Sequence, residues 1–86
     1  MDLYFKKKFI KKFKKLPVNI RAKFSENIKL FKINTHNSIL NNHALHGTYA
    51  NCRSINVTGD LRAVYKTQNK NRVLFVDIDN HPNLYK

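Results

Sequence analysis

The spacing of the apolar residues changes once along this chain, and that change restricts the fold more than any other feature. In residues 1–33 apolar side chains recur three to five positions apart, which places them on one face of a helix. After Gly47 the spacing becomes roughly alternating, which is typical of β-strands. A chain of 86 residues has room for one domain, so we expect helices packed on a sheet as two layers.

The helical part divides at Leu16-Pro17, because proline restricts the residue before it and suits the first turn of a following helix. We therefore expect a helical hairpin over about 5–33, with two antiparallel helices joined by a short turn. Residues 2–5 are a candidate for a short edge strand before it. The apolar stripes are formed by Phe5, Phe9, Ile10 and Phe13, then by Ile20, Phe24, Ile28 and Phe31. The phenylalanines of these stripes are expected in the core.

The remaining residues are predicted to form the sheet layer. Residues 34–46 are rich in asparagine and histidine and are expected to be a loop that crosses from the helices to the sheet. An antiparallel sheet is expected over about 48–79, and the segment 80–86 should fold back over it. The strands expected in this sheet cover residues 48–57, 61–67 and 72–79. The prediction is one α+β domain over 1–86, with two helices on a small twisted antiparallel sheet.

The charge of the chain is strongly basic and uneven. There are 17 Lys and Arg residues against 5 acids, a formal net charge of +12, and residues 1–33 carry +9 of it. Such a charge favours a polyanionic partner, with nucleic acid as the first candidate and an anionic membrane surface or an acidic protein as alternatives. Lysines of the first helix are candidate RNA contacts, namely Lys7, Lys8, Lys11, Lys12 and Lys15.

The cysteine content and the hydropathy also narrow the possibilities. The single cysteine, Cys52, excludes an internal disulfide and a metal–thiolate site and indicates a reducing cytosol. No apolar run approaches the ~20 residues that span a bilayer. We expect a cytoplasmic protein without a membrane partner.

Four short motifs follow one another in the C-terminal half, at residues 43–47, 53–57, 59–65 and 79–85. They read His-Ala-Leu-His-Gly, Arg-Ser-Ile-Asn-Val, Gly-Asp-Leu-Arg-Ala-Val-Tyr and Asp-Asn-His-Pro-Asn-Leu-Tyr. In this order and spacing, the chain resembles the YafQ branch of the RelE/ParE toxin superfamily over nearly its whole length. The resemblance implies a microbial-RNase-like fold and the toxin of a type II toxin–antitoxin module.

The resemblance also implies an activity and partners. YafQ-like toxins are endoribonucleases, or mRNA interferases, that cleave mRNA in the A site of the small ribosomal subunit without a metal ion. A cognate antitoxin binds and silences them. The expected partners are therefore mRNA, the ribosome and an antitoxin, in a toxin–antitoxin complex that is expected to be oligomeric. No metal or other cofactor is expected.

The resemblance assigns roles to individual positions. His43 matches the histidine of the family's H-x-L-x-G segment. His81 matches the histidine of the G-T-H-x-x-L-[FY] segment, and Tyr85 matches the aromatic residue that closes it. Asp60 matches the aspartate in the turn ahead of the next strand, and Arg62 resembles the catalytic arginine that RelE places on this strand.

The chain departs from the YafQ pattern at three places. Asn56 stands where YafQ has a histidine, Leu61 replaces a tryptophan, and Asp79-Asn80 replaces Gly-Thr before His81. The first departure removes one possible acid or base. The third changes the backbone that leads into His81.

Metal-free RNA cleavage uses the 2′-hydroxyl as the nucleophile on the adjacent phosphate, so it needs a base, an acid and a cation. Histidine exchanges protons near neutral pH, and arginine binds phosphate through parallel N–H groups. We predict His81 and His43 as the acid–base pair, with the order of their roles open. Arg62 is the predicted phosphate ligand, with Arg53 as the second choice. DNA, which lacks the 2′-hydroxyl, should not be cut.

Supporting roles and alternative functions complete the prediction. Tyr85 is expected to stack on a base or bond to phosphate, and Asp60 to orient a histidine or the guanidinium.

One alternative function is that of a gyrase inhibitor like ParE, although ParE-type toxins lack the histidine set. Another is a relative that binds RNA or ribosomes without cutting, which Asn56 keeps open. A membrane-active basic helix is a weaker option, because the phenylalanine stripe is better explained by covering the sheet.

Overall fold

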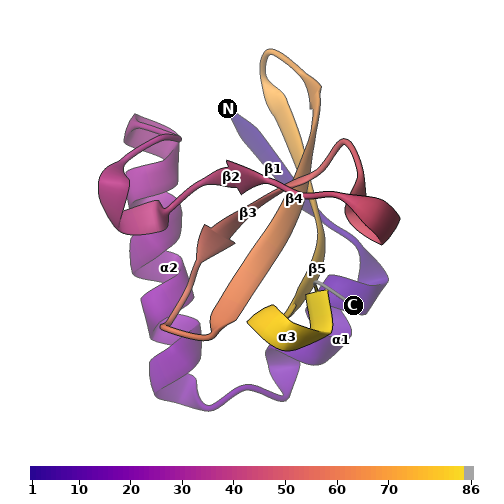
Figure 1. The fold of residues 1–86 in the computed structure, drawn as a ribbon. Coiled ribbons are helices and arrows are strands. Elements are labelled where there is room, and N and C mark those ends of the chain that lie inside the picture. Colours follow the sequence, from indigo (N-terminus) through magenta and orange to yellow (C-terminus); the bar gives the residue numbers. More distant parts are fainter. Residues whose placement is uncertain (85–86) are drawn as a thin grey trace.

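The computed structural model describes residues 1–84, in which the two longer helices cover one face of a five-stranded sheet (Figure 1). The first elements are β1 (Asp2–Phe5), α1 (Lys7–Lys14) and α2 (Val18–Ile33). Two short 3-10 helices, η1 (Ser38–Leu40) and η2 (Gly47–Tyr49), flank β2 (His43–Ala44). The chain continues through β3 (Arg53–Asn56), β4 (Leu61–Asn69), β5 (Arg72–Asn80) and α3 (His81–Leu84). The predicted α+β class is confirmed.

The strand order is β1-β5-β4-β3-β2, so the last four strands form the expected antiparallel meander. The candidate edge strand at residues 2–5 is present, but β1 runs parallel to β5. The sheet is therefore not antiparallel throughout. The direction of β1 is not fixed by a tight hairpin, because the helices and the other strands lie between β1 and β5 in the sequence. A long connection of this kind allows the two strands to pair in parallel.

The structure differs from the sequence prediction at two boundaries. His43 and Ala44, expected in a loop, pair with β3 as the strand β2. Residues 48–52, expected in a strand, contain η2 and a turn, and β3 begins at Arg53. Left-handed backbone at Gly47 (φ +67°) and Asn51 (φ 70°) explains this interruption, because an extended strand cannot include such residues.

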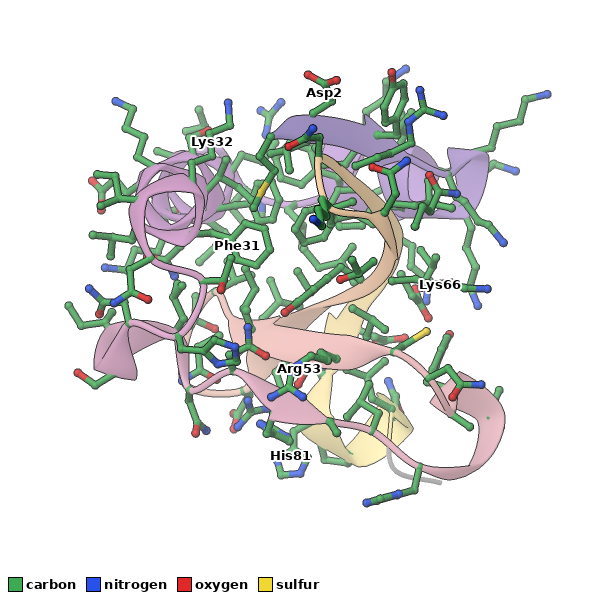
Figure 2. The ribbon with its side chains drawn as sticks, turned by 90° about the horizontal axis from the view of Figure 1, so that it is seen from above. Asp2, Phe31, Lys32, Arg53, Lys66 and His81 are labelled. Atoms are coloured by element: carbon green, nitrogen blue, oxygen red, sulfur yellow. The ribbon has the colours of Figure 1, made fainter. Side chains whose placement is uncertain are left out.

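Apolar side chains cover both faces of the central strands. Between the helices and the sheet, Phe31 of α2 contacts Tyr65 of β4, with ring centroids 4.9 Å apart. Figure 2 shows Phe31 between α2 and the sheet. This first core cluster also includes Phe9, Phe24, Ile55, Ala63 and Phe75. A second cluster on the opposite face consists of Leu45, Cys52, Val64, Val76 and Leu84. Within residues 1–84, no helix is long and apolar enough to cross a bilayer.

Asn27 is a buried polar residue that joins α2 to the sheet. Its Nδ2 donates a hydrogen bond of 2.7 Å to the backbone carbonyl of Asn56. The substitution Asn27→Leu should lower the free energy of unfolding by about 1–3 kcal/mol, because the carbonyl loses this partner away from water. Urea denaturation measures the change, and Asn19→Leu on the exposed part of α2 is the matched control. Equal losses in both variants would show that the buried hydrogen bond contributes nothing.

Candidate active site

Three of the predicted site residues, His43, Arg62 and His81, lie on the face of the sheet opposite α2. Successive side chains of a strand point to opposite faces, and Ala63 packs in the first cluster while Val64 packs in the second. Arg62 therefore lies on the same face as Val64. Figure 2 shows that His81, at the start of α3, lies on the far side of the sheet from Phe31. Arg62 and α3 thus belong to one face.

A row of polar residues crosses this face. Arg62 on β4 is the cross-strand partner of Asn56 on β3 and of Asp79 on β5. Cross-strand partners project from the same face and neighbouring strands lie ~4.8 Å apart, so the row is about 10 Å across. Two residues before Asn56, Ser54 pairs with His43 of β2. This register places His43 diagonally across the face from Arg62.

Arg62 is a buried cation, and its acidic cross-strand partner, Asp79, forms hydrogen bonds with other residues. Arg62 is 7% exposed, and its Nε and Nη1 have no hydrogen-bond partner within residues 1–84. The Asp79 Oδ2 accepts from the Lys12 Nζ at 2.9 Å, and its Oδ1 accepts from the Asn83 Nδ2 at 2.9 Å. An ionised group that is buried without partners is unfavourable. Such an arrangement is therefore typical of a site for an anionic ligand.

Asn56, which stands where the YafQ pattern has a histidine, contributes a buried polar atom. Its side-chain Oδ1 has no hydrogen-bond partner within the described residues. Because Asn56 and Arg62 are cross-strand partners, an unsatisfied acceptor and unsatisfied donors project from neighbouring positions of the face. Both kinds of group are needed to bind a ribose hydroxyl beside a phosphate.

His43 is half-buried, and its contacts define its tautomer. The Nδ1 lies 2.9 Å from the backbone oxygen of Asn41, and the Nε2 lies 3.5 Å from the Ser54 Oγ. A carbonyl oxygen can only accept a hydrogen bond, so Nδ1 carries the hydrogen in the neutral ring. The Nε2 is therefore the basic nitrogen of His43.

His81 and Asp60 are joined through the main chain. The backbone N–H of His81 donates to the carbonyl oxygen of Asp60 at 2.7 Å, which ties the start of α3 to the turn before β4. The Asp60 side chain is exposed. Asp60 thus helps to place the histidine-bearing helix by way of its carbonyl oxygen. The predicted site residue Tyr85 lies outside the described residues.

Arg53, the second choice for a phosphate ligand, lies apart from this row. Its Nε donates to the Asn42 Oδ1 at 2.7 Å, and the Asn42 Nδ2 donates to the Tyr65 hydroxyl at 2.6 Å. Arg53 is also the cross-strand partner of Tyr65, which belongs to the helix-side core. Arg53 therefore projects toward the opposite face from Arg62.

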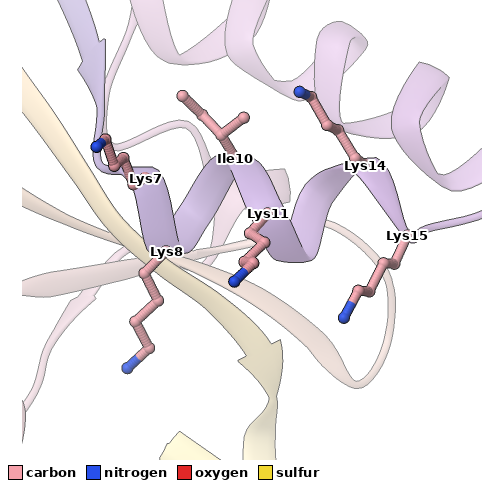
Figure 3. A pocket seen from close by; sticks show the side chains of 6 residues that line it. All are labelled: Lys7, Lys8, Ile10, Lys11, Lys14 and Lys15. Atoms are coloured by element: carbon pink, nitrogen blue, oxygen red, sulfur yellow. The ribbon is translucent and has the colours of Figure 1, made fainter.

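The lysines of α1 divide into an outer and an inner group. A surface hollow of about 750 Å³ lies along the helix. Figure 3 shows the side chains that line it, Lys7, Lys8, Ile10, Lys11, Lys14 and Lys15. Lys12 instead turns toward the sheet, where its Nζ lies 2.8 Å from the Asp77 Oδ1 and 2.9 Å from the Asp79 Oδ2. Lys8 takes part in both groups, because its Nζ is also 3.3 Å from the Asp77 Oδ2.

Asp77 and Asp79 are ionised under these lysines. Burial by itself raises the pKa of Asp77, but hydrogen bonds from Lys12 and Tyr49 and the charge of Lys12 outweigh it, so the pKa is below its ordinary value. Burial likewise raises the pKa of Asp79, whereas hydrogen bonds from Asn83 and Lys12 lower the pKa to about 2. Both carboxylates therefore remain charged at neutral pH.

The ionised carboxylate of Asp79 should stabilise the fold, and this contribution should be lost in acid. The pKa of its carboxyl is about 2 in the folded chain and ~3.9 in an unfolded chain. Its stabilising contribution is therefore fully present above about pH 4 and is lost as the pH falls through about 2. Between about pH 5 and about pH 2, the free energy of unfolding should fall by ~1–2 kcal/mol less in Asp79→Asn than in the unmodified chain. Parallel pH curves for the two proteins would contradict this.

No protein-family model and no curated protein sequence matches the chain. Solved structures do match. YafQ from E. coli has a TM-score of 0.79 and 19% identity, over 99% of this chain and 98% of that one. A copper-bound mutant toxin from Helicobacter pylori has a TM-score of 0.78 and 26% identity, over 98% of both chains. A chain of the E. coli DinJ-YafQ toxin-antitoxin complex has a TM-score of 0.71 and 20% identity, over 99% of this chain and 97% of that one.

These similarities cover nearly the full length of both partners, so the chain has the fold of the YafQ-like toxins. The resemblance to YafQ that the four motifs predict is thereby confirmed at the level of the fold. His43, Arg62 and His81 come from three different elements, β2, β4 and α3, and the fold gathers them toward one face.

Proposed function

We propose that this chain is the toxin of a type II toxin–antitoxin pair and that it cleaves mRNA by metal-free attack of a 2′-hydroxyl on the adjacent phosphate. The observation that carries the proposal is the buried guanidinium of Arg62, whose Nε and Nη1 have no partner within residues 1–84 and which lies on the face that also holds two histidines. The fold shared with YafQ, which is a partner in a toxin-antitoxin complex, supports it.

In the proposed reaction the phosphate binds at the guanidinium of Arg62. The Nε2 of His43 removes the proton from the 2′-hydroxyl, and the 2′-oxygen then attacks phosphorus. The bond from phosphorus to the 5′-oxygen breaks, and His81 donates a proton to that oxygen. The products are a 2′,3′-cyclic phosphate and a 5′-hydroxyl end. Arg62 stabilises the negative charge that develops on the phosphate oxygens.

The outer face of α1 suits the remainder of a polyanionic substrate. Lys7, Lys11, Lys14 and Lys15 line the hollow seen in Figure 3, and lysines bind phosphates without regard to sequence. We propose that this face contacts the RNA backbone, either of the mRNA or of the ribosome that presents it. Affinity should therefore fall steeply as the salt concentration rises.

The proposed partner protein is a cognate antitoxin, by analogy with DinJ in its complex with YafQ. With a formal net charge of +12, the chain favours a partner segment of acidic character. Such a segment would bind the same basic surfaces that serve RNA, and binding would silence the toxin. An oligomeric toxin–antitoxin complex is expected from the same analogy.

The proposal is tested with purified chain on free mRNA with a chelator present, and on ribosomes carrying a defined mRNA without one. We expect cuts that end in a 2′,3′-cyclic phosphate, and a single 2′-deoxy nucleotide 5′ to the scissile phosphate should abolish its cleavage. If both free and ribosome-bound mRNA stay intact, the proposal fails. Ribosome binding without cutting would favour the non-cleaving relative, and loss of gyrase supercoiling would favour a ParE-like inhibitor.

A further inference from the structure

Lys12 differs from the other lysines of α1 because its ammonium group is hydrogen-bonded to two carboxylates. Its Nζ donates to the Asp77 Oδ1 at 2.8 Å and to the Asp79 Oδ2 at 2.9 Å. The side chain of Asp77 is 3% exposed and that of Asp79 is 28% exposed, so this bridge is partly shielded from water. A lysine held in this way is poorly placed to serve as a contact to RNA.

Asp79 is also the acidic residue nearest to Arg62 along the sheet. The two are cross-strand partners, whose Cβ atoms typically lie ~5 Å apart. An arginine and a carboxylate at that separation ordinarily form a charge-assisted pair. Here Lys12 takes one oxygen of Asp79, while the Asn83 side chain and the backbone N–H of Asn80 take the other. Among the residues that the structure describes, Arg62 consequently keeps its Nε and Nη1 unpaired.

We propose that Lys12 is a positioning residue that holds the carboxylate of Asp79 away from Arg62 and so keeps the guanidinium available for phosphate. The consequence for cleavage rests on the proposed function, whereas the arrangement of the three side chains can be tested without it. Once Lys12 is removed, a change of the Asp79 side-chain torsions brings its carboxylate to Arg62. The substrate phosphate must then compete with an internal anion in a site of low dielectric constant.

The decisive experiment compares the single variant Lys12→Met with a double variant in which Asp79 is also neutralised. Lys12→Met should lower the cleavage rate at saturating substrate about 10–100-fold, because Arg62 becomes paired with Asp79. The double variant Lys12→Met with Asp79→Asn should recover most of that loss, because a neutral amide does not neutralise the guanidinium. If Lys12 contacted RNA directly, the second substitution would not restore the rate.

Lys11→Met is the matched control, since it removes the same charge from the outer face of α1. We expect it to raise KM and to reduce the salt dependence of binding, with little change in kcat. Equal effects of Lys11→Met and Lys12→Met on KM and kcat would overturn the inference. Lys12→Gln, which keeps a donor for the buried Asp77, replaces Lys12→Met if the methionine variant does not fold.

A second readout does not depend on cleavage. The Nε–H signal of Arg62 in a ¹⁵N NMR spectrum should shift and exchange more slowly with water in Lys12→Met, and it should return toward its original position in the double variant. An Nε–H signal unchanged by Lys12→Met would overturn the inference. If the unmodified chain cuts no RNA, the proposed function fails, and the Arg62 signal alone then decides whether Lys12 controls this contact.

Discussion

Replacing Arg62 with methionine is expected to slow mRNA cleavage about 10²–10³-fold, while the free energy of unfolding stays the same or increases. The rate falls because the charge that develops on the phosphate loses a cation placed in a dry site. Stability does not fall, because the guanidinium is buried, two of its nitrogens have no partner in the described part of the chain, and methionine fills similar space without an ionised group. Loss of activity without loss of stability is the sign of a residue kept for function.

The experiment combines single-turnover cleavage with urea denaturation of the same preparations. Arg53→Met is the contrasting variant, because its guanidinium is bonded to Asn42. It should destabilise the fold by about 0.5–1.5 kcal/mol and slow cleavage less than the Arg62 variant. The prediction for Arg62 is wrong if Arg62→Met unfolds the protein and cleavage declines only with the folded fraction.

The fold could be predicted from sequence wherever a periodic pattern is long. The long strands β4 and β5 begin at Leu61 and Arg72, as the alternating pattern predicts. The two-residue strand β2 was missed, because His43 and Ala44 are too few to show a period and owe their conformation to pairing with β3. The parallel direction of β1 was missed for a similar reason, since it depends on contacts far apart in the sequence.

The site shows the same division between local and distant information. The resemblance to the YafQ pattern implies that His43, Arg62 and His81 belong to one site. The inward turn of Lys12 could not be predicted, because the lysine run from residue 6 to residue 15 appears uniformly solvent-exposed in the sequence. A signal does exist, since Lys8 and Lys12 share a helix face and Asp77 and Asp79 share a strand face. Only the packing of α1 on β5 shows that these two faces meet.

The third departure from the YafQ pattern, Asp79-Asn80 in place of Gly-Thr, is also explained by contacts that only the structure shows. Asp79 replaces a glycine that the family has before the histidine, which suggested a different approach to His81. In the structure the carboxylate accepts from the Asn80 N–H and the Asn83 side chain, so it binds two groups of the segment that carries α3. The substitution therefore adds contacts to this segment, and His81 remains tied to the Asp60 carbonyl.

Replacing His81 with glutamine is expected to slow cleavage about 10²–10⁴-fold, which is the range for loss of a positioned acid or base. Glutamine retains similar size and hydrogen-bonding capacity but does not exchange protons near neutral pH. His36→Gln is the matched control, because His36 is exposed and lies in the connection between α2 and η1, away from the row that crosses the sheet. Initial rates of the two variants on ribosome-bound mRNA measure the difference.

A modified substrate separates the acid from the base. Sulfur in place of the 5′-bridging oxygen leaves without needing a proton, so a variant that lacks only the general acid should cut this substrate almost as fast as the unmodified chain does. We expect that recovery for His81→Gln. His43→Gln should remain slow on both substrates, because the 2′-hydroxyl still needs a base and the variant lacks the imidazole that we propose for that role. Recovery of the His43 variant alone would reverse the two roles, and recovery of neither would remove His81 as the acid.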